Sequence, residues 1–211
     1  MTGDAFGHTG VVTVSLVLAS GSPRRRQLLS GLVAQLTIVT PGVDETPAKH
    51  EEARRYVKRI SQLKAGAVGA HAGGDAVVVA ADTCVTIDGA ILGKPTGPDG
   101  AAAMLRELSG RSHHTITGVT VRSARGTDTI SVATEVVFAT LSDEDIEWYV
   151  ATGEPLDKAG AYGLQGLGGL FVRRIEGSHS NVIGLPLAET AHLLRKHGVD
   201  VARVGTATTV P

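Results

Sequence analysis

The chain has 211 residues, of which 42% are hydrophobic and 19% charged, and its formal net charge is −1. This balance favours one folded α/β domain and argues against stable binding of nucleic acid, which needs a strongly basic surface. The single cysteine, Cys84, excludes an internal disulfide, and no apolar stretch nears the ~20 residues that span a membrane. The N-terminal residues lack the basic start and long apolar core that are typical of a signal peptide. We therefore expect a cytoplasmic protein that does not associate with a membrane.

The most informative stretch lies near the N-terminus. The apolar run Val11–Leu18 predicts a buried strand, and Ser22-Pro23 predicts the start of a helix, because serine caps helices and proline suits their first position. Arg24–Arg26 then fall in the first helical turn, where cations are unfavourable next to the positive helix end. Free N–H groups and guanidiniums together predict a site for a multiply charged anion. The alternative is an ordinary turn with a solvated basic face.

The middle of the chain predicts a helix, a buried strand and a hairpin. Residues at three- and four-residue spacing predict a helix over Glu51–Val68, with Lys64 at the edge of its apolar face. That face comprises Ala53, Tyr56, Val57, Ile60, Leu63 and Ala67. Ala76–Ala81 predicts a central strand buried on both faces. Asp88-Gly89 predicts a tight turn between strands at Thr83–Ile87 and Ala90–Leu92.

The second half predicts further helices and strands in alternation. In chain order these are a helix at Pro98–Leu108, strands at Thr115–Arg122 and Thr129–Ala139 with a turn near Gly126, a helix from Ser142 to near Gly153, a glycine-rich loop at Gly160–Gly169, a strand at Leu170–Ile175 and a helix at Pro186–His197. Alternation at both ends, with hairpins between, predicts a mixed sheet covered by helices in an α/β or α+β arrangement.

Three loop positions could carry chemistry. Asp82 follows the central strand, where a carboxylate can hold a divalent metal or take a proton from water; the alternative is an aspartate that caps a turn. Lys94, held between Gly93 and Pro95, could present an ammonium to a phosphate or be a surface lysine. Asp44 and Glu45 would be candidate metal ligands only if Asp82 lies nearby, because Mg²⁺ at a phosphate site takes one or two protein carboxylates.

The segment Lys158–Gly166 is the second informative stretch. Its small residues let the backbone approach a flat ligand, and the Gln165 amide offers a donor and an acceptor that suit the edge of a nucleobase. The alternative is a flexible glycine loop. The sequence contains no zinc-ligand spacing, no Walker-type loop and no Rossmann fingerprint, and Cys84 is expected to be a small core residue.

Taken together, these segments resemble the Maf family of nucleoside triphosphate pyrophosphatases. The matching segments occur in family order between about Val14 and His197. They are Leu18–Arg25, Val43–Glu45, Tyr56–Arg59 with Lys64-Ala65, Ala81–Thr83, Leu92–Pro95, Thr117–Val119, Lys158–Gly166 and Gly184–Leu187. Any one of these segments is a weak signal, whereas the ordered set is specific.

The resemblance implies a mixed α/β fold, similar to that of the inosine triphosphate pyrophosphatases, with two lobes around a central cleft. It implies one domain over residues 11–200 and a homodimer. The ends at 1–10 and 201–211 are expected to be flexible because their residues are small and polar. It also implies that a nucleoside triphosphate is hydrolysed to the monophosphate and pyrophosphate with a divalent metal such as Mg²⁺ or Mn²⁺. The family is further associated with septum formation and the arrest of cell division.

The resemblance also assigns roles to residues. Asp82 would accept the proton of water and, with Glu45, hold the metal, while Lys64 and Lys94 would act in catalysis. Substrate binding would fall to Ser20, Ser22, Arg24, Arg25, Thr83 and Gln165. Arg25, Thr83 and Gln165 match the branch that cleaves dTTP and UTP. Two alternatives remain open: a pyrophosphatase for 7-methyl-GTP or another non-canonical nucleotide, and a nucleotide-binding division regulator with little catalysis.

Overall fold

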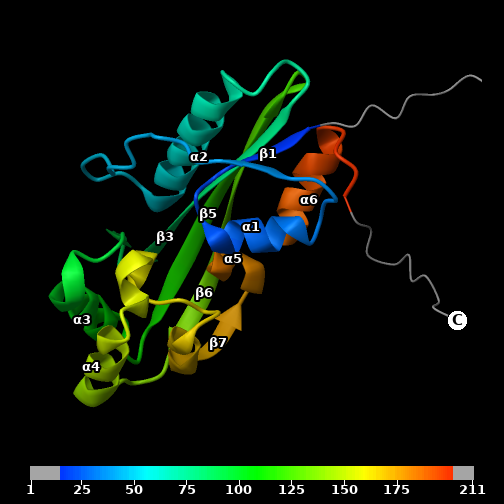
Figure 1. The fold of residues 1–211 in the computed structure, drawn as a ribbon. Helices are drawn as coiled ribbons and strands as arrows, with labels where there is room; N and C mark the ends of the chain where they lie inside the picture. The colour runs from blue at the N-terminus through cyan, green and yellow to red at the C-terminus, as the bar shows by residue number, and fades with distance from the viewer. Residues whose placement is uncertain (1–14, 202–211) are drawn as a thin grey trace, which may run out of the picture.

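A computed structural model describes residues 15–201 of the chain (Figure 1). The flexible end predicted at residues 1–10, and all but the first residue of that predicted at 201–211, lie outside this range. So does the first half of the strand predicted at 11–18. Within the described range the prediction of a mixed sheet flanked by helices is confirmed. No helix there is both long and apolar enough to cross a membrane.

A seven-stranded sheet forms the centre of the molecule, with the order β2-β1-β3-β5-β6-β7 and β4 paired to β3. The strands are β1 (Leu16–Ala19), β2 (Thr37–Val39), β3 (Val77–Ile87), β4 (Ala90–Leu92), β5 (Ser112–Ser123), β6 (Gly126–Phe138) and β7 (Val172–Glu176). Strand β1 runs parallel to β2 and β3, and the other described pairs are antiparallel.

Helices cover both faces of this sheet (Figure 1). The helices are α1 (Pro23–Ser30), α2 (Ala53–Gly69), α3 (Gly97–Leu108), α4 (Asp143–Ala151), α5 (His179–Ile183) and α6 (Leu187–Lys196). Three short 3₁₀ segments follow α4, namely η1 (Glu154–Asp157), η2 (Ala159–Ala161) and η3 (Leu167–Phe171). The sequence did not predict α5 or β2, because elements of five and three residues carry too short a pattern unless a turn signal marks them, as Asp88-Gly89 does for β4.

Successive residues of β1 enter different parts of the core. Leu18 packs in the cluster that contains Leu29 of α1 and Leu194 of α6, whereas Val17 packs with Ala65 of α2. This is the alternation expected of a strand, and it explains why β1 reads as a continuous apolar run. A separate cluster joins α3 and α4 to the C-terminal ends of β3 and β6, around Phe138.

Strand β3 continues through Asp82, so the prediction of a strand that ends at Ala81 was wrong. On one edge, β1 pairs with β3 along Val77–Ala80, and β4 pairs with it along Val85–Ile87. Strand β5 pairs with the opposite edge from Val78 to Thr86 and holds β3 in one piece. The described pairings therefore leave Ala81–Cys84 without a partner strand on the β1 edge.

Helix α2 lies where the sequence predicts it, but its buried face differs from the prediction. Leu63 is 45% exposed and Ala67 is also exposed, whereas Lys64 is buried. Periodicity counts only apolar residues, so it assigned Lys64 to the edge of the face. The burial of Lys64 depends on carboxylates from other parts of the chain.

Two local predictions are confirmed. Asp88 and Gly89 both adopt positive φ angles, of 50° and 81°, as a type I′ turn between two antiparallel strands requires. Ser142 caps α4, and its partner Asp145 completes a capping box.

Gly118 of β5 allows α2 to approach the sheet closely. A Cβ atom added at Gly118 would lie 2.3 Å from the carbonyl oxygen of Val57 and 2.8 Å from the backbone nitrogen of Lys58. Both atoms belong to the backbone of α2, so the helix would have to move as a unit. Gly118 also pairs directly with Asp82 of β3, so this contact fixes the distance between α2 and the middle of β3.

We predict that Gly118→Ala lowers the free energy of unfolding by about 1–3 kcal/mol, because the added methyl group overpacks a rigid backbone contact. Urea denaturation of both proteins measures this difference. Gly66→Ala is the matched control on α2, since its Cβ would meet nothing closer than 3.9 Å. That control should stabilise by about 0.4–1 kcal/mol, as alanine favours the helix. Equal stability of Gly118→Ala and the wild type would contradict the argument.

Candidate active site

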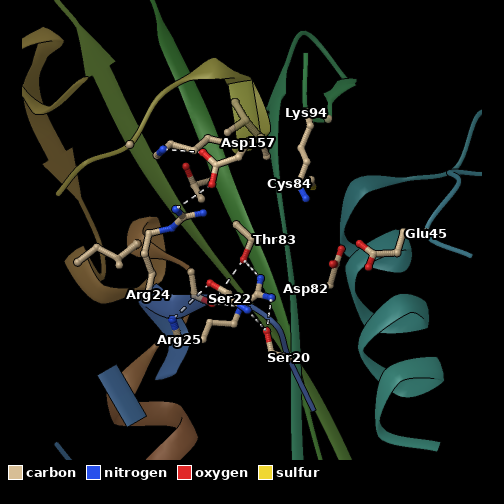
Figure 2. Close-up of a pocket in the computed structure, with 18 of the residues that line it drawn as sticks. Ser20, Ser22, Arg24, Arg25, Glu45, Asp82, Thr83, Cys84, Lys94 and Asp157 are labelled. Atoms are coloured by element: carbon tan, nitrogen blue, oxygen red, sulfur yellow. Dashed lines mark hydrogen bonds and ion pairs between the residues drawn. The ribbon is translucent and has the colours of Figure 1, made fainter. Parts of the chain in front are cut away.

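A cavity of about 750 Å³ lies beside the unpaired stretch of β3, within the volume range of small-molecule sites (Figure 2). All the site residues predicted from the sequence line it. They are Ser20, Ser22, Arg24, Arg25, Glu45, Lys64, Asp82, Thr83, Lys94 and Gln165. The structure therefore brings together residues that are up to 145 positions apart in the chain. Their individual roles remain predictions.

The cavity takes side chains from both faces of the sheet. Asp82 and Thr83 are neighbours on β3, so their side chains point to opposite faces. Asp82 faces α2 and its Lys64, while Thr83 hydrogen-bonds Thr117 of β5 and the side chain of Arg25 from α1. Figure 2 shows the same division, with Glu45 beside Asp82 and Arg25 near Thr83. Because Ala81–Cys84 have no partner strand on the β1 edge of β3, the cavity at this edge is accessible to the side chains of both faces.

Lys64 connects two carboxylates on the α2 side of the cavity. Its Nζ lies 2.7 Å from Oδ1 of Asp82 and 2.9 Å from Oε1 of Glu45. The side chains of Lys64 and Asp82 are each only 6% exposed, whereas that of Glu45 is half exposed. Tyr56 lies about two turns before Lys64 on α2. Its hydroxyl donates to the backbone carbonyl of Glu45 at 2.9 Å and so holds the loop that carries Glu45.

Asp82 has the properties of a proton acceptor. Burial raises the pKa of its carboxyl group above the ordinary value, and the charges of Lys64 and Arg25 oppose that shift. Its Oδ1 is bound to Lys64, while Oδ2 is buried and has no hydrogen-bond partner among the described residues. A raised pKa brings a carboxylate closer to the range in which it accepts a proton efficiently.

The start of α1 forms the other side of the cavity. Ser22 caps the helix by accepting from the N–H of Arg25 at 3.4 Å, and Pro23 occupies the first position, as predicted. Ser20, directly after β1, accepts from the N–H of Ser22 at 3.2 Å. A helix begins here beside the cavity. Pro23 carries no N–H, and the N–H groups of Arg25 and Arg26 are bonded to Ser22, so the first turn offers an anion the backbone N–H of Arg24.

Arg25 makes contacts that the sequence did not predict. Its Nε donates to the carbonyl of Gly184 at 2.8 Å and its Nη2 to Thr83 at 2.9 Å. Its Nη1 donates to Ser20 at 3.3 Å. These partners fix the guanidinium across β3 and the end of α5, and each terminal nitrogen carries a second hydrogen that could bind an anion. Arg25 therefore organises the site as well as lining it.

Arg24 points across the cavity to η1, and this pairing was also missed. Its Nη1 lies 3.7 Å from Oδ2 of Asp157 (Figure 2). The other carboxylate oxygen of Asp157, Oδ1, accepts from Nζ of Lys158 at 2.7 Å. The sequence singled out Lys158 but not Asp157. A lone aspartate beside a glycine-rich loop carries no local signal, because its partner on α1 is more than 130 residues away.

The remaining predicted residues border the cavity with exposed side chains. Lys94 follows β4 and extends toward the cavity in Figure 2, and Gln165 lies on the loop between η2 and η3. Cys84 is buried, as predicted, and burial raises the pKa of its thiol to about 12, so it stays a neutral core residue.

The carboxylates of Asp82 and Glu45 are the groups in the cavity that could hold a divalent metal. No group of three or more histidine, cysteine or acidic side chains suited to a metal occurs in the part of the chain that the structure describes. Mg²⁺ at phosphate sites needs only one or two carboxylates, since phosphate oxygens and water complete its shell. The partnerless Oδ2 of Asp82 and the half-exposed Glu45 fit this kind of site.

Comparison with known proteins identifies relatives of the chain. A family model described as Maf-like protein matches residues 15–197. A protein of Anaeromyxobacter dehalogenans named dTTP/UTP pyrophosphatase is 54% identical over 187 residues, which cover 87% of this chain and 94% of that protein. A protein of the same name from Escherichia coli O157:H7 is 50% identical over 180 residues, covering 85% of this chain and 91% of that protein.

A solved structure also shares the fold. The Ham1 protein of Staphylococcus aureus aligns over 86% of this chain and 98% of its own, with 13% identity and a TM-score of 0.51. This likeness concerns the arrangement of the sheet and helices only.

We predict that Lys64→Met lowers the free energy of unfolding by about 3–5 kcal/mol near neutral pH, because it leaves a buried carboxylate without its cation. Losing Lys64 raises the pKa of Asp82 further. A raised folded-state pKa favours the protonated form, so stability is retained at low pH and lost as the pH rises through that pKa. The loss should therefore shrink in acid, and urea denaturation at about pH 7.5 and about pH 5 measures it.

Lys58→Met, at a half-buried position on the same helix, is the control for this experiment. It should change stability by less than about 1 kcal/mol at either pH. A loss for Lys64→Met that is equal at the two pH values would contradict the assignment of the effect to Asp82.

Proposed function

The chain belongs to the Maf family, and we propose that it hydrolyses dTTP and UTP to the nucleoside monophosphate and pyrophosphate. It is then a pyrophosphate-releasing nucleoside triphosphate hydrolase. The observation that carries the proposal is the meeting of Asp82 and Lys64 with the arginine-bearing start of α1 in one cavity. The choice of dTTP and UTP as substrates is supported by the relatives that are 54% and 50% identical to this chain and are named dTTP/UTP pyrophosphatase.

In this proposal Asp82 takes the proton of the attacking water. The water oxygen forms a bond to the α-phosphorus, the bond from that phosphorus to the oxygen bridging to the β-phosphorus breaks, and the leaving group is pyrophosphate. The raised pKa and the partnerless Oδ2 of Asp82 support this role. Lys64, 2.7 Å from the other carboxylate oxygen, keeps Asp82 in place and balances its charge.

The phosphates are proposed to bind at the start of α1. The backbone N–H of Arg24, the outer hydrogens of Arg25 and the side chain of Arg24 border this part of the cavity. Lys94 is proposed to bind the phosphates from the opposite wall. Cations spread over the phosphate oxygens stabilise the charge that develops as the bond to the leaving group breaks.

Gln165 is proposed to contact the nucleobase. Its exposed amide lies on the cavity wall and offers both a donor and an acceptor, which match the carbonyl and N–H groups of a pyrimidine edge. Such hydrogen bonds discriminate strongly between bases, because a wrong base leaves polar groups unpaired.

A divalent metal would be held by Asp82 and Glu45. When bound, it would neutralise phosphate charge and polarise the phosphoryl oxygens. Lys64 already lies between the same two carboxylates, so this chain supplies one fixed positive charge there by itself.

The setting of the reaction remains a proposal from the family resemblance. We propose that a homodimer carries it out in the cytoplasm, that it removes non-canonical or excess nucleotides, and that it is linked to septum formation. The single cysteine, which is buried, is consistent with a reducing compartment.

We predict that the wild-type protein releases pyrophosphate from dTTP and UTP faster than from CTP, GTP, ITP and 7-methyl-GTP. Asp82→Asn should lower kcat by roughly 10²–10⁴-fold, since it removes the proton acceptor while keeping the side-chain size. Coupled detection of pyrophosphate measures the rates. Asp75→Asn is the matched control, because Asp75 is an exposed aspartate just before β3 and should leave the rate unchanged.

Each result of this panel has a distinct meaning. Release of phosphate instead of pyrophosphate would refute the proposed reaction. Preference for 7-methyl-GTP or ITP would keep the reaction and overturn the substrate. Nucleotide binding without turnover of any substrate would favour the binding regulator.

We predict that Glu45→Gln raises the Mg²⁺ concentration needed for half-maximal activity, by roughly tenfold if one carboxylate contact is lost. EDTA should abolish activity in both proteins. A Mg²⁺ titration of the rate with dTTP at saturation measures the shift, and Glu52→Gln, at the cap of α2, serves as an acidic control from a nearby segment. An unchanged Mg²⁺ requirement would exclude Glu45 as a ligand.

A further inference from the structure

Glu154 supports the loop that carries Gln165. It is the first residue of η1, and Oε2 of its carboxylate accepts from the N–H of Leu167 at 3.0 Å. Its Oε1 accepts from the N–H of Gly168 at 3.2 Å and from the hydroxyl of Tyr149 at 2.8 Å. Glu154 does not itself line the cavity described above. It therefore acts on the site only through the loop.

Tyr149 extends this support to the other end of the loop. Its side chain is fully buried, and its hydroxyl oxygen accepts from the N–H of Gly163 at 3.2 Å. The same hydroxyl donates to Glu154, so one hydrogen-bonded pair holds the backbone at Gly163 and again at residues 167–168. The short stretch between these anchors, residues 164–166, carries Gln165 at its centre.

Glycines let these two side chains lie directly against the loop backbone. A Cβ atom added at Gly166 would lie 2.3 Å from Oε1 of Glu154, and one added at Gly168 would lie 2.6 Å from the hydroxyl of Tyr149. The glycine-rich character of this segment is thus explained by the side chains behind it. Flexibility is not needed to account for it.

The carboxylate is held in its charged form. Burial opposes ionisation of Glu154, but hydrogen bonds from Leu167, Tyr149 and Gly168 outweigh it and lower the pKa of the carboxyl group. Hydrogen bonds that a charged group accepts from backbone N–H groups are stronger than neutral ones. The loop is therefore anchored by strong contacts on its outer side, while the exposed amide of Gln165 borders the cavity.

The same residue also reaches the phosphate side of the cavity. The backbone carbonyl of Glu154 accepts from Nζ of Lys158 at 2.6 Å, and Lys158 in turn contacts Asp157, the partner of Arg24. The carboxylate of Glu154 and its carbonyl thus serve different walls of one cavity. A side-chain substitution removes only the contacts to the loop.

We propose that Glu154, acting with Tyr149, is a positioning residue that sets nucleobase selectivity by holding Gln165 in place. This inference rests on the proposed function, because it assumes that Gln165 contacts the base. Without the carboxylate, residues 164–166 could adopt other positions, and the amide would no longer meet a pyrimidine edge in one fixed orientation. Discrimination between bases should suffer more than the chemical step, because Asp82 and Lys64 lie on other elements.

The test compares Glu154→Ala and Glu154→Gln with the wild type in kcat and KM for dTTP and for GTP. Glutamine keeps the size of the side chain but replaces one of its two acceptor oxygens with an N–H₂ group, so the N–H of either Leu167 or Gly168 loses its acceptor. Tyr149→Phe is a second route to the same loop, since it removes the hydroxyl and keeps the packed ring. Glu147→Gln, an exposed glutamate of α4, is the matched control. Amide hydrogen exchange of residues 163–168 reports on the loop independently of activity.

We expect Glu154→Ala and Glu154→Gln to raise KM for dTTP by roughly tenfold, which corresponds to about 1.4 kcal/mol, with a much smaller change in kcat. The preference for dTTP over GTP should fall, and exchange at residues 163–168 should speed up. Tyr149→Phe should act in the same direction to a smaller extent, and Glu147→Gln should match the wild type. An equal loss of kcat for both nucleotides at an unchanged preference would overturn the proposal, as would unchanged exchange.

Equilibrium binding of dTTP and GTP in EDTA separates this inference from the proposed function. If the wild type binds dTTP selectively but releases no pyrophosphate, the proposed function fails, and loss of that binding selectivity in Glu154→Ala still supports the inference. If the wild type hydrolyses dTTP and Glu154→Ala keeps the wild-type selectivity, the inference alone fails. A wild type that shows no selectivity in either assay would overturn both.

Discussion

The burial of Lys64 between Asp82 and Glu45 is the interaction on which the candidate site depends. A lysine enclosed in this way is tolerated only when carboxylates compensate its charge, and an aspartate as buried as Asp82 equally needs a cation. Helix α2 carries the lysine and β3 the aspartate, and the close contact at Gly118 fixes the distance between these elements. The packing of a helix on a sheet thus determines the geometry of the charged group in the cavity.

The break in strand pairing along β3 turns this packing into an accessible site. If β1 continued beyond Ala19, the edge of β3 at Ala81–Cys84 would be covered, and Asp82 and Thr83 would lie on separate faces of a closed sheet. Because β1 gives way to α1 at this point, a cavity can take side chains from both faces. The end of β1 therefore also places the start of α1 beside β3, close to Asp82.

The sequence predicted most elements and the membership of the site, and its failures have a common cause. Local signals such as the Ser22-Pro23 cap, the Asp88-Gly89 turn and the helix start at Ser142 are complete within a few residues, and each is confirmed. The buried position of Lys64 and the continuation of β3 through Asp82 depend on partners far along the chain, which a local pattern does not contain. The contacts of Arg25 with Gly184 and of Arg24 with Asp157 were missed for the same reason.

Charge is distributed unequally across the cavity: the α1 side is positive, and the side with Asp82 and Glu45 is negative. Arg25 is held by uncharged oxygens from Gly184, Thr83 and Ser20, so hydrogen bonding fixes it without cancelling its charge. Lys64 is shared by two carboxylates and belongs to a group that is negative as a whole. A polyphosphate is therefore attracted to the α1 side and repelled by Asp82 and Glu45, so a further cation would strengthen its binding. This imbalance of charge supports the proposal that a divalent metal accompanies the substrate, since the carboxylate proposed to take the proton also opposes the approach of the phosphates.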